Sequence, residues 1–168
     1  MKVALSIHHH SPSYGGPYTV ISETAYYMYK KNLNINLLMA ENQYTTFKRN
    51  YNAILKTIDL LHCFGIWTPD HIKVFYSAKK LKKKIIISPL GGLEPWSMLQ
   101  KKYKKKLAWF IYQKKILEDC DHIHATSDDE KKHLIDLNVT TPITVIPHGV
   151  AINNVKKDKI IKNKKKAL

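Results

Sequence analysis

The chain has 168 residues, of which 44% are hydrophobic, and this content predicts one soluble globular domain with its own core. No stretch of about 20 uninterrupted apolar residues predicts a membrane span. The formal net charge of +15 suggests an anionic partner, but Arg49 is the single arginine among 28 basic residues, which argues against nucleic-acid recognition.

The first half of the chain alternates between strand and helix patterns. Residues 2–8 form a short run rich in Val and Ile, typical of a buried parallel strand. Loop residues follow, and Pro17 suits the first turn of a helix that we expect to reach residue 31. The next expected elements are a strand at 34–40, a helix at 50–57, a strand at 59–65 and a helix at 69–81.

The second half continues this alternation, with strands at 84–88, 122–126 and 142–149 and helices at 97–118 and 128–137. In the longest helix we expect one apolar stripe to face the core, namely Leu99, Tyr103, Leu107, Phe110 and Leu117. The opposite face would be solvated or would rest on an anionic membrane, and it carries Lys101, Lys105, Trp109 and Tyr112.

Six strands separated by helices predict an α/β fold with a doubly wound parallel sheet, in a single Rossmann-like domain. We place this domain at residues 1–150. Residues 151–168 are rich in lysine and are expected to form a tail without a core.

Polar or glycine-rich residues follow five of the six strands, as "HHHSPSYGGP", "HCFGIW", "SPLGGLEPW", "ATSDDE" and "PHGV". Parallel α/β sheets bind ligands beyond the carboxyl ends of their strands, so these loops are expected to converge on one cleft. Gly15 and Gly16 precede a helix whose amides favour a phosphate or carboxylate. The dinucleotide fingerprint, the Walker motif and the hydrolase nucleophile elbow are all absent from the sequence.

Other sequence features predict no metal site and a reducing compartment. His8, His9 and His10 are adjacent, so they would alternate between the two faces of a strand, and no acid or thiol has ligand spacing. Cys63 and Cys120 fit no disulfide framework, and no secretion signal precedes the first strand. A cytoplasmic location, with peripheral contact to the inner membrane face, is therefore expected.

The order and spacing of "SYGGP", "HCFGIW", "SPLGGLEPW", "HATSDDE" and "IPHGV" resemble the amino-terminal half of GT-B glycosyltransferases of the family 4 type. The resemblance covers about residues 1–150. It implies one half of a GT-B fold, with a nucleotide sugar as donor and no further cofactor.

The resemblance also implies site residues, although it assigns no catalytic one. Gly15 and Gly16 would face the donor phosphates and the reacting sugar, and Ser127 and Glu130 would lie near the floor of the cleft. Residues expected on the acceptor side are His62, Gly65, Trp67, Gly91, Glu94 and Trp96. Aromatic faces, a carboxylate and bare glycine backbone suit a sugar ligand.

The chain departs from the family pattern in two respects. Leu90 stands where many relatives place His or Arg, and the sequence ends soon after "IPHGV", which in relatives leads into a donor-binding domain. We therefore expect a split subunit that needs a separate donor-binding chain, or a truncated remnant. Its acceptor would be a polysaccharide or a lipid-linked sugar. A glycan-binding or membrane-surface module without catalytic activity is the alternative.

Overall fold

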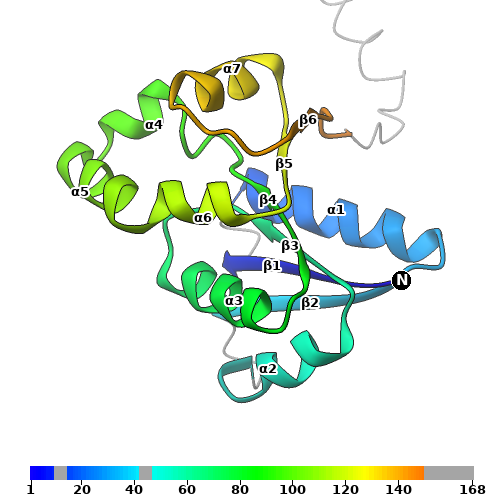
Figure 1. Cartoon of the computed structure of the whole chain (residues 1–168). Coiled ribbons are helices and arrows are strands. Elements are labelled where there is room, and N and C mark those ends of the chain that lie inside the picture. Colours follow the sequence, from blue (N-terminus) through cyan, green and yellow to red (C-terminus); the bar gives the residue numbers. More distant parts are fainter. Residues whose placement is uncertain (10–14, 42–46, 150–168) are drawn as a thin grey trace, which may run out of the picture.

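The computed structural model describes residues 1–9, 15–41 and 47–149, and it confirms the predicted α/β fold (Figure 1). Six parallel strands form one sheet in the order β2-β1-β3-β4-β5-β6. The strands are β1 Lys2–His9, β2 Asn34–Glu41, β3 Leu60–Phe64, β4 Lys84–Ser88, β5 His122–Ala125 and β6 Ile143–Val145. The expected tail at 151–168 lies outside the described residues.

Helices connect the strands and cover both faces of the sheet (Figure 1). They are α1 Gly16–Lys30, α2 Phe47–Thr57, α3 Pro69–Lys80, α4 Pro95–Leu99, α5 Lys102–Ala108, the π-helix η2 Trp109–Gln113, α6 Lys114–Asp119 and α7 Asp128–Asp136. One core cluster joins α1, through Ile21, to Leu5 and Phe64. The larger cluster packs α2, α3 and α6 against the other face of the sheet.

The predicted long helix at 97–118 is wrong in both its continuity and its buried face. The helix breaks after α4 because Lys101 adopts a left-handed conformation, and the π-helix then shifts the helical register. As a result Trp109, Gln113 and Leu117 point to the core, whereas Tyr103 and Phe110 are exposed. A single 3.6-residue period over the whole segment could not anticipate either interruption.

The sixth strand is also shorter than expected, because β6 ends at Val145 instead of continuing to residue 149. It lies at the edge of the sheet, where β5 is its neighbour, and Pro147 has no backbone N–H to extend the ladder. The chain therefore leaves the sheet before His148, which becomes available to line a cavity.

β2 pairs with one edge of β1, and the chain then crosses back so that β3 pairs with the other edge of β1. This reversal creates a topological switch point between β1 and β3, where ligands bind in folds of this kind. His8, at the end of β1, reaches across this point, with its Nδ1 3.0 Å from Oδ2 of Asp70 in α3.

Substituting Gly92 by alanine is expected to lower the free energy of unfolding by about 1–3 kcal/mol, because the new methyl group would be overpacked. An ideal Cβ there lies 2.7 Å from Cγ1 of Ile66 and 3.0 Å from the carbonyl oxygen of Pro89. Gly16→Ala is the matched control, since its Cβ would meet nothing within 4 Å. Urea denaturation measures both variants, and equal stabilities would contradict this packing account.

Candidate functional site

A cavity of about 350 Å³ lies at the carboxyl edge of the sheet. Four separate segments line it: the start of α1, the loop after β4, the residue after β5 and the residues after β6. The lining residues are Gly16, Pro17, Val20, Leu90, Gly91, Glu94, Thr126 and His148. Loops that are far apart in the sequence therefore converge on one site, as the parallel topology predicts.

Of the predicted site residues, Gly16, Gly91 and Glu94 line this cavity directly. Gly15 precedes Gly16 as the N-cap residue of α1, with a positive φ of 66° that favours glycine. Trp96 lies at the start of α4, and its side chain is exposed. These positions bring the two glycine-rich loops together.

Glu130 supports the cavity from behind, because its buried carboxylate fixes two of the lining segments. Its Oε1 accepts a hydrogen bond from the Gly91 amide at 2.7 Å. Its Oε2 accepts hydrogen bonds from the amide of Thr126 at 2.7 Å and from its hydroxyl at 2.9 Å. Ser127 caps α7 by accepting a hydrogen bond from the Glu130 amide, which fixes the start of the helix that carries this carboxylate.

Trp67 anchors the loop after β4 from its other side. Its indole Nε1 donates to the carbonyl oxygen of Gly92 at 2.9 Å, and its own amide donates to Oε1 of Gln113 at 3.1 Å. Lys105 also folds toward this point, where its Nζ donates to the Ser97 carbonyl and lies 5.6 Å from the Trp67 ring centroid. Trp67 thus contacts the loop that shapes the cavity.

Gly65 lines a separate and much smaller cavity of about 10 Å³, which also contacts the ring of His71. Gly65 has a φ of 88°, and His71 Cε1 lies 3.5 Å from the position of its ideal Cβ. Burial lowers the pKa of His71 to about 4, so this ring is neutral at pH 7.

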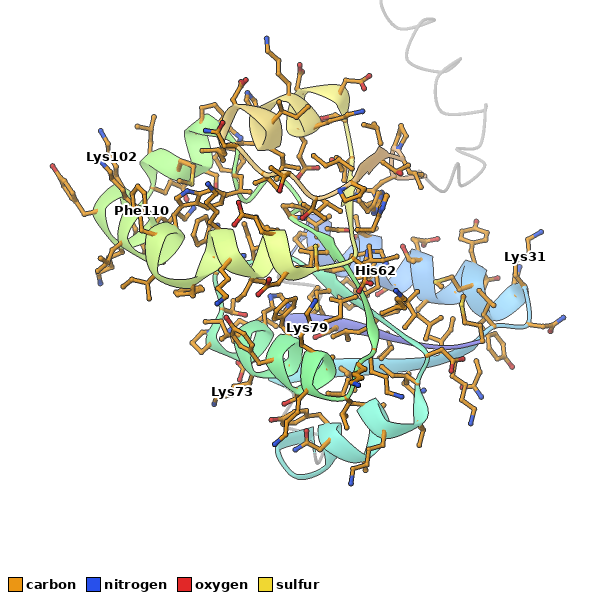
Figure 2. The ribbon with its side chains drawn as sticks, in the orientation of Figure 1. Lys31, His62, Lys73, Lys79, Lys102 and Phe110 are labelled. Atoms are coloured by element: carbon orange, nitrogen blue, oxygen red, sulfur yellow. The ribbon has the colours of Figure 1, made fainter. Side chains whose placement is uncertain are left out.

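His62 lies in β3, near the middle of the molecule (Figure 2), and belongs to a hydrogen-bonded chain across the sheet. Its Nε2 is 2.7 Å from Oγ of Ser88, which is 2.8 Å from Nδ1 of His124, and Nε2 of His124 is 2.8 Å from the Ile146 carbonyl. A carbonyl only accepts, so neutral His124 must carry its proton on Nε2. Ser88 then donates to His124 and accepts from His62. The chain fixes the segment that leads to His148.

The stability of the protein is expected to fall as the pH falls below about 6.5. Burial, aided by His124 and His148, lowers the pKa of His62 to about 3 from an ordinary 6.5. Between these values the unfolded state binds more protons, so acid favours unfolding. We expect His62 to account for about 2 kcal/mol of the stability lost between pH 7 and pH 5. Urea denaturation of His62→Gln should show a loss that is smaller by this amount, and identical losses would contradict the assignment.

Glu94 and His133 make a close polar contact at the rim of the cavity. Oε2 of Glu94, from the loop after β4, lies 2.8 Å from Nδ1 of His133 in α7. The contact orients the Glu94 carboxylate, which is partly buried and lines the cavity. A carboxylate in this position can accept hydrogen bonds from hydroxyl groups of a ligand.

Sequence reasoning did not name Pro17, Val20, Thr126 and His148 as residues lining the site, whereas Leu90 was noted as a departure from the family pattern. Thr126 is the last residue of the strand predicted at 122–126 and His148 is the last but one of the strand predicted at 142–149, so their position at a strand end was the available signal. Val20 lies one helical turn inside α1. Nothing in the sequence around Val20 indicates that it lies close to the loop after β4. His148 also lines a second cavity of about 240 Å³ beside Thr19 and Tyr27 of α1.

The loop after β4 has two consecutive residues with positive φ, Leu90 at 54° and Gly91 at 71°. Leucine rarely adopts this conformation, and backbone strain of this kind concentrates at binding sites. The turn exposes the Gly91 amide to Glu130 and directs the chain along the cavity wall. The two glycines of "SPLGGLEPW" thus differ in purpose: Gly91 permits the turn, and Gly92 permits close packing.

The described residues contain no group of three His, Cys, Asp or Glu side chains that could hold a metal ion. Within the same residues, no helix has the length and apolar character needed to cross a membrane.

An all-parallel sheet with helices on both faces and a cavity at its carboxyl edge defines a Rossmann-like domain. The chain belongs to glycosyltransferase family 4, whose sequence pattern matches residues 19–154. The resemblance inferred from the sequence motifs is thereby confirmed.

Two solved structures of Anabaena HepE share this fold. The TM-scores are 0.56 for the complex with UDP and glucose and 0.60 for the complex with UDP-glucose, each at 12% sequence identity. Each comparison covers 99% of this chain and 50% of the HepE chain, so this chain spans half the length of that protein. No curated protein matches the chain in sequence.

Proposed function

We propose that this chain is the acceptor-side domain of an enzyme that transfers a sugar from a nucleotide sugar to a polysaccharide or lipid-linked acceptor. The supporting observation is the cavity of about 350 Å³ at the carboxyl edge of the sheet, in a chain of glycosyltransferase family 4. This volume lies within the range of small-molecule sites. Its location is the usual ligand position in α/β sheets.

The start of α1 supplies the part of the cavity that suits the donor phosphates. Its N-cap residue is Gly15, which has no side chain to occupy the amides, and its first turn has no acidic residue. The helix dipole therefore favours an anion beside Gly16. In sugar transfer, negative charge develops on the departing nucleoside diphosphate, and fixed amide dipoles stabilise that charge.

The opposite wall of the cavity suits a sugar ring. Glu94 and Thr126 offer polar oxygen atoms for hydroxyl groups, and Leu90 offers an apolar surface for C–H groups. Burial lowers the pKa of His148, so its imidazole is neutral at pH 7 and presents one donor and one acceptor. These residues would orient the acceptor and the reacting sugar, and orientation contributes much of the rate in such transfers.

We further propose that a second Rossmann-like domain, on this polypeptide or on a separate chain, binds most of the donor. The HepE structure that contains UDP-glucose has a chain twice as long as the part this chain matches. In this arrangement the cavity described above would form one side of the cleft between the two domains.

The test is to measure nucleoside diphosphate release from a panel of nucleotide sugars, with and without an added donor-binding domain and an acceptor glycan. We expect release only when the donor-binding domain and the acceptor are both present. Release by this chain alone would overturn the requirement for a second domain. Glycan binding without release under every combination would instead identify a binding module.

A further inference from the structure

The helical segment that follows the cavity-lining Glu94 in the chain exposes an unusual number of large apolar side chains. Six of them, on or beside α4, α5 and η2, are between 62% and 86% exposed: Trp96, Leu99, Tyr103, Leu107, Phe110 and Ile111. We call these six residues the apolar helical face. Four of them, from Tyr103 to Ile111, recur at spacings of four, three and one residues, which places them on one side of the helix. Exposed apolar patches of this kind mark sites of contact with a partner or a membrane.

The charges around the apolar helical face have one sign. Residues 95–117 contain seven lysines and no acidic residue. The exposed lysines of α5 and its N-cap are Lys101, Lys102, Lys104 and Lys106. Lys105 is different, because its Nζ turns inward to the carbonyl oxygen and hydroxyl of Ser97. The other lysines of this segment therefore lie at the surface around the apolar side chains. Lys105 instead ties α5 to α4 through Ser97.

Figure 2 shows this segment as a projection at one end of the molecule. Lys102 and Phe110 lie together at that end, and both side chains are exposed. Lys31 lies at the opposite end, beyond α1. The projection is therefore accessible to an extended surface.

We propose that the apolar helical face docks on a membrane surface rich in anionic lipid. A helix with apolar and aromatic residues on one side and lysines beside them lies in the interface between head groups and acyl chains. Each lysine near an anionic surface adds to the attraction, and the long lysine side chains reach the head groups while their stems cover apolar area. The absence of acidic residues in this segment favours anionic lipid over a basic protein partner.

Docking in this way would place the candidate site beside the membrane. α4 begins at Pro95, immediately after Glu94, which lines the cavity. An acceptor carried by a lipid could then reach the cavity without leaving the bilayer. This inference goes beyond the proposed function and concerns residues outside the cavity, so vesicle binding and sugar transfer can fail independently.

The experiment is co-sedimentation of the chain with large vesicles, without nucleotide sugar. Vesicles of phosphatidylcholine alone are compared with vesicles containing about one third phosphatidylglycerol, at low and high salt. We expect binding to the anionic vesicles that weakens at high salt, because exposed charges are screened. Failure to bind anionic vesicles at low salt, or equal binding to both compositions, would overturn the proposal.

Two matched double variants test whether vesicle binding depends on the apolar helical face or only on the net charge of the chain. Lys102→Glu with Phe110→Ser changes the apolar helical face, and Lys31→Glu with Tyr29→Ser makes the same charge change at the far end of the molecule. Tyr29 and Phe110 are similarly exposed, at 74% and 73%. We expect the first variant to lose about tenfold or more in vesicle affinity and the second to lose less than about threefold. Equal losses would overturn the assignment to this face. Because all four side chains are at the surface, both variants should keep the wild-type unfolding midpoint.

A second copy of the chain is the competing occupant of this face. Sedimentation velocity of the wild type and of the Lys102→Glu, Phe110→Ser variant distinguishes self-association from membrane docking. We expect both proteins to be in the same oligomeric state. A wild-type dimer that the variant dissociates would overturn membrane docking as the role of this face.

Discussion

Replacing Glu130 by alanine is expected to lower the free energy of unfolding by on the order of 3 kcal/mol or more. The carboxylate is almost fully buried and accepts hydrogen bonds from the Gly91 amide and from the amide and hydroxyl of Thr126. Its removal would leave these donors unpaired in a poorly hydrated site, and each unpaired buried donor costs about 1–3 kcal/mol. Urea denaturation monitored by tryptophan fluorescence measures the loss.

The control for Glu130 is its neighbour Asp129, which is exposed in the same first turn of α7. Asp129→Ala removes a carboxylate near the helix N-terminus without unpairing a buried donor, so we expect a loss below about 1 kcal/mol. If the two variants were equally stable, Glu130 would not be the residue that holds the loops after β4 and β5 together.

The second large effect is expected at Glu94, once the chain is combined with the proposed donor-binding domain. Glu94→Gln should lower kcat/KM by about 10- to 100-fold, because a hydrogen bond to a charged acceptor contributes about 1.5–3 kcal/mol. The substitution keeps the size of the side chain, which is partly buried at the cavity wall. Steady-state release of nucleoside diphosphate measures the effect.

His133→Gln provides the matched comparison for Glu94. It retains an N–H donor for the Glu94 carboxylate, which lies 2.8 Å from Nδ1 of His133, and it leaves that carboxylate in the cavity. We expect its kcat/KM to stay within about threefold of the wild type. A loss as large as that of Glu94→Gln would indicate that the pair supports the loop and that Glu94 does not contact the substrate.

The strands could be predicted from the sequence because buried parallel strands are short apolar runs separated by polar connections. Their parallel order then places Gly16, Gly91 and Thr126 at one edge, which is why the general position of the site was accessible from the sequence. The helical segment after β4 was predicted incorrectly, since the left-handed Lys101 and the π-helix interrupt its period. Neither interruption has a distinct local signal in a run of lysines and aromatic residues.

Side-chain partners could not be predicted from the same patterns. The buried Glu130 lies in an exposed-looking "SDDE" sequence, and its contact with Gly91 joins residues that are 39 positions apart. The chain of hydrogen bonds from His62 through Ser88 to His124 likewise needs the register of three strands. Long-range pairs of this kind depend on the assembled sheet, whereas periodicity describes one element at a time.

We propose that the loops at the carboxyl edge of the sheet form one site, which contacts the phosphates and sugar of the donor at the start of α1 and the acceptor on the opposite wall. The most direct measurement is a titration of the ¹⁵N-labelled chain with UDP-glucose, followed by amide chemical shifts. We expect the shifts to concentrate at Gly16, Gly91, Thr126 and His148, with none at Lys31 or Lys73. Shifts scattered over the surface, or concentrated away from this edge, would contradict it.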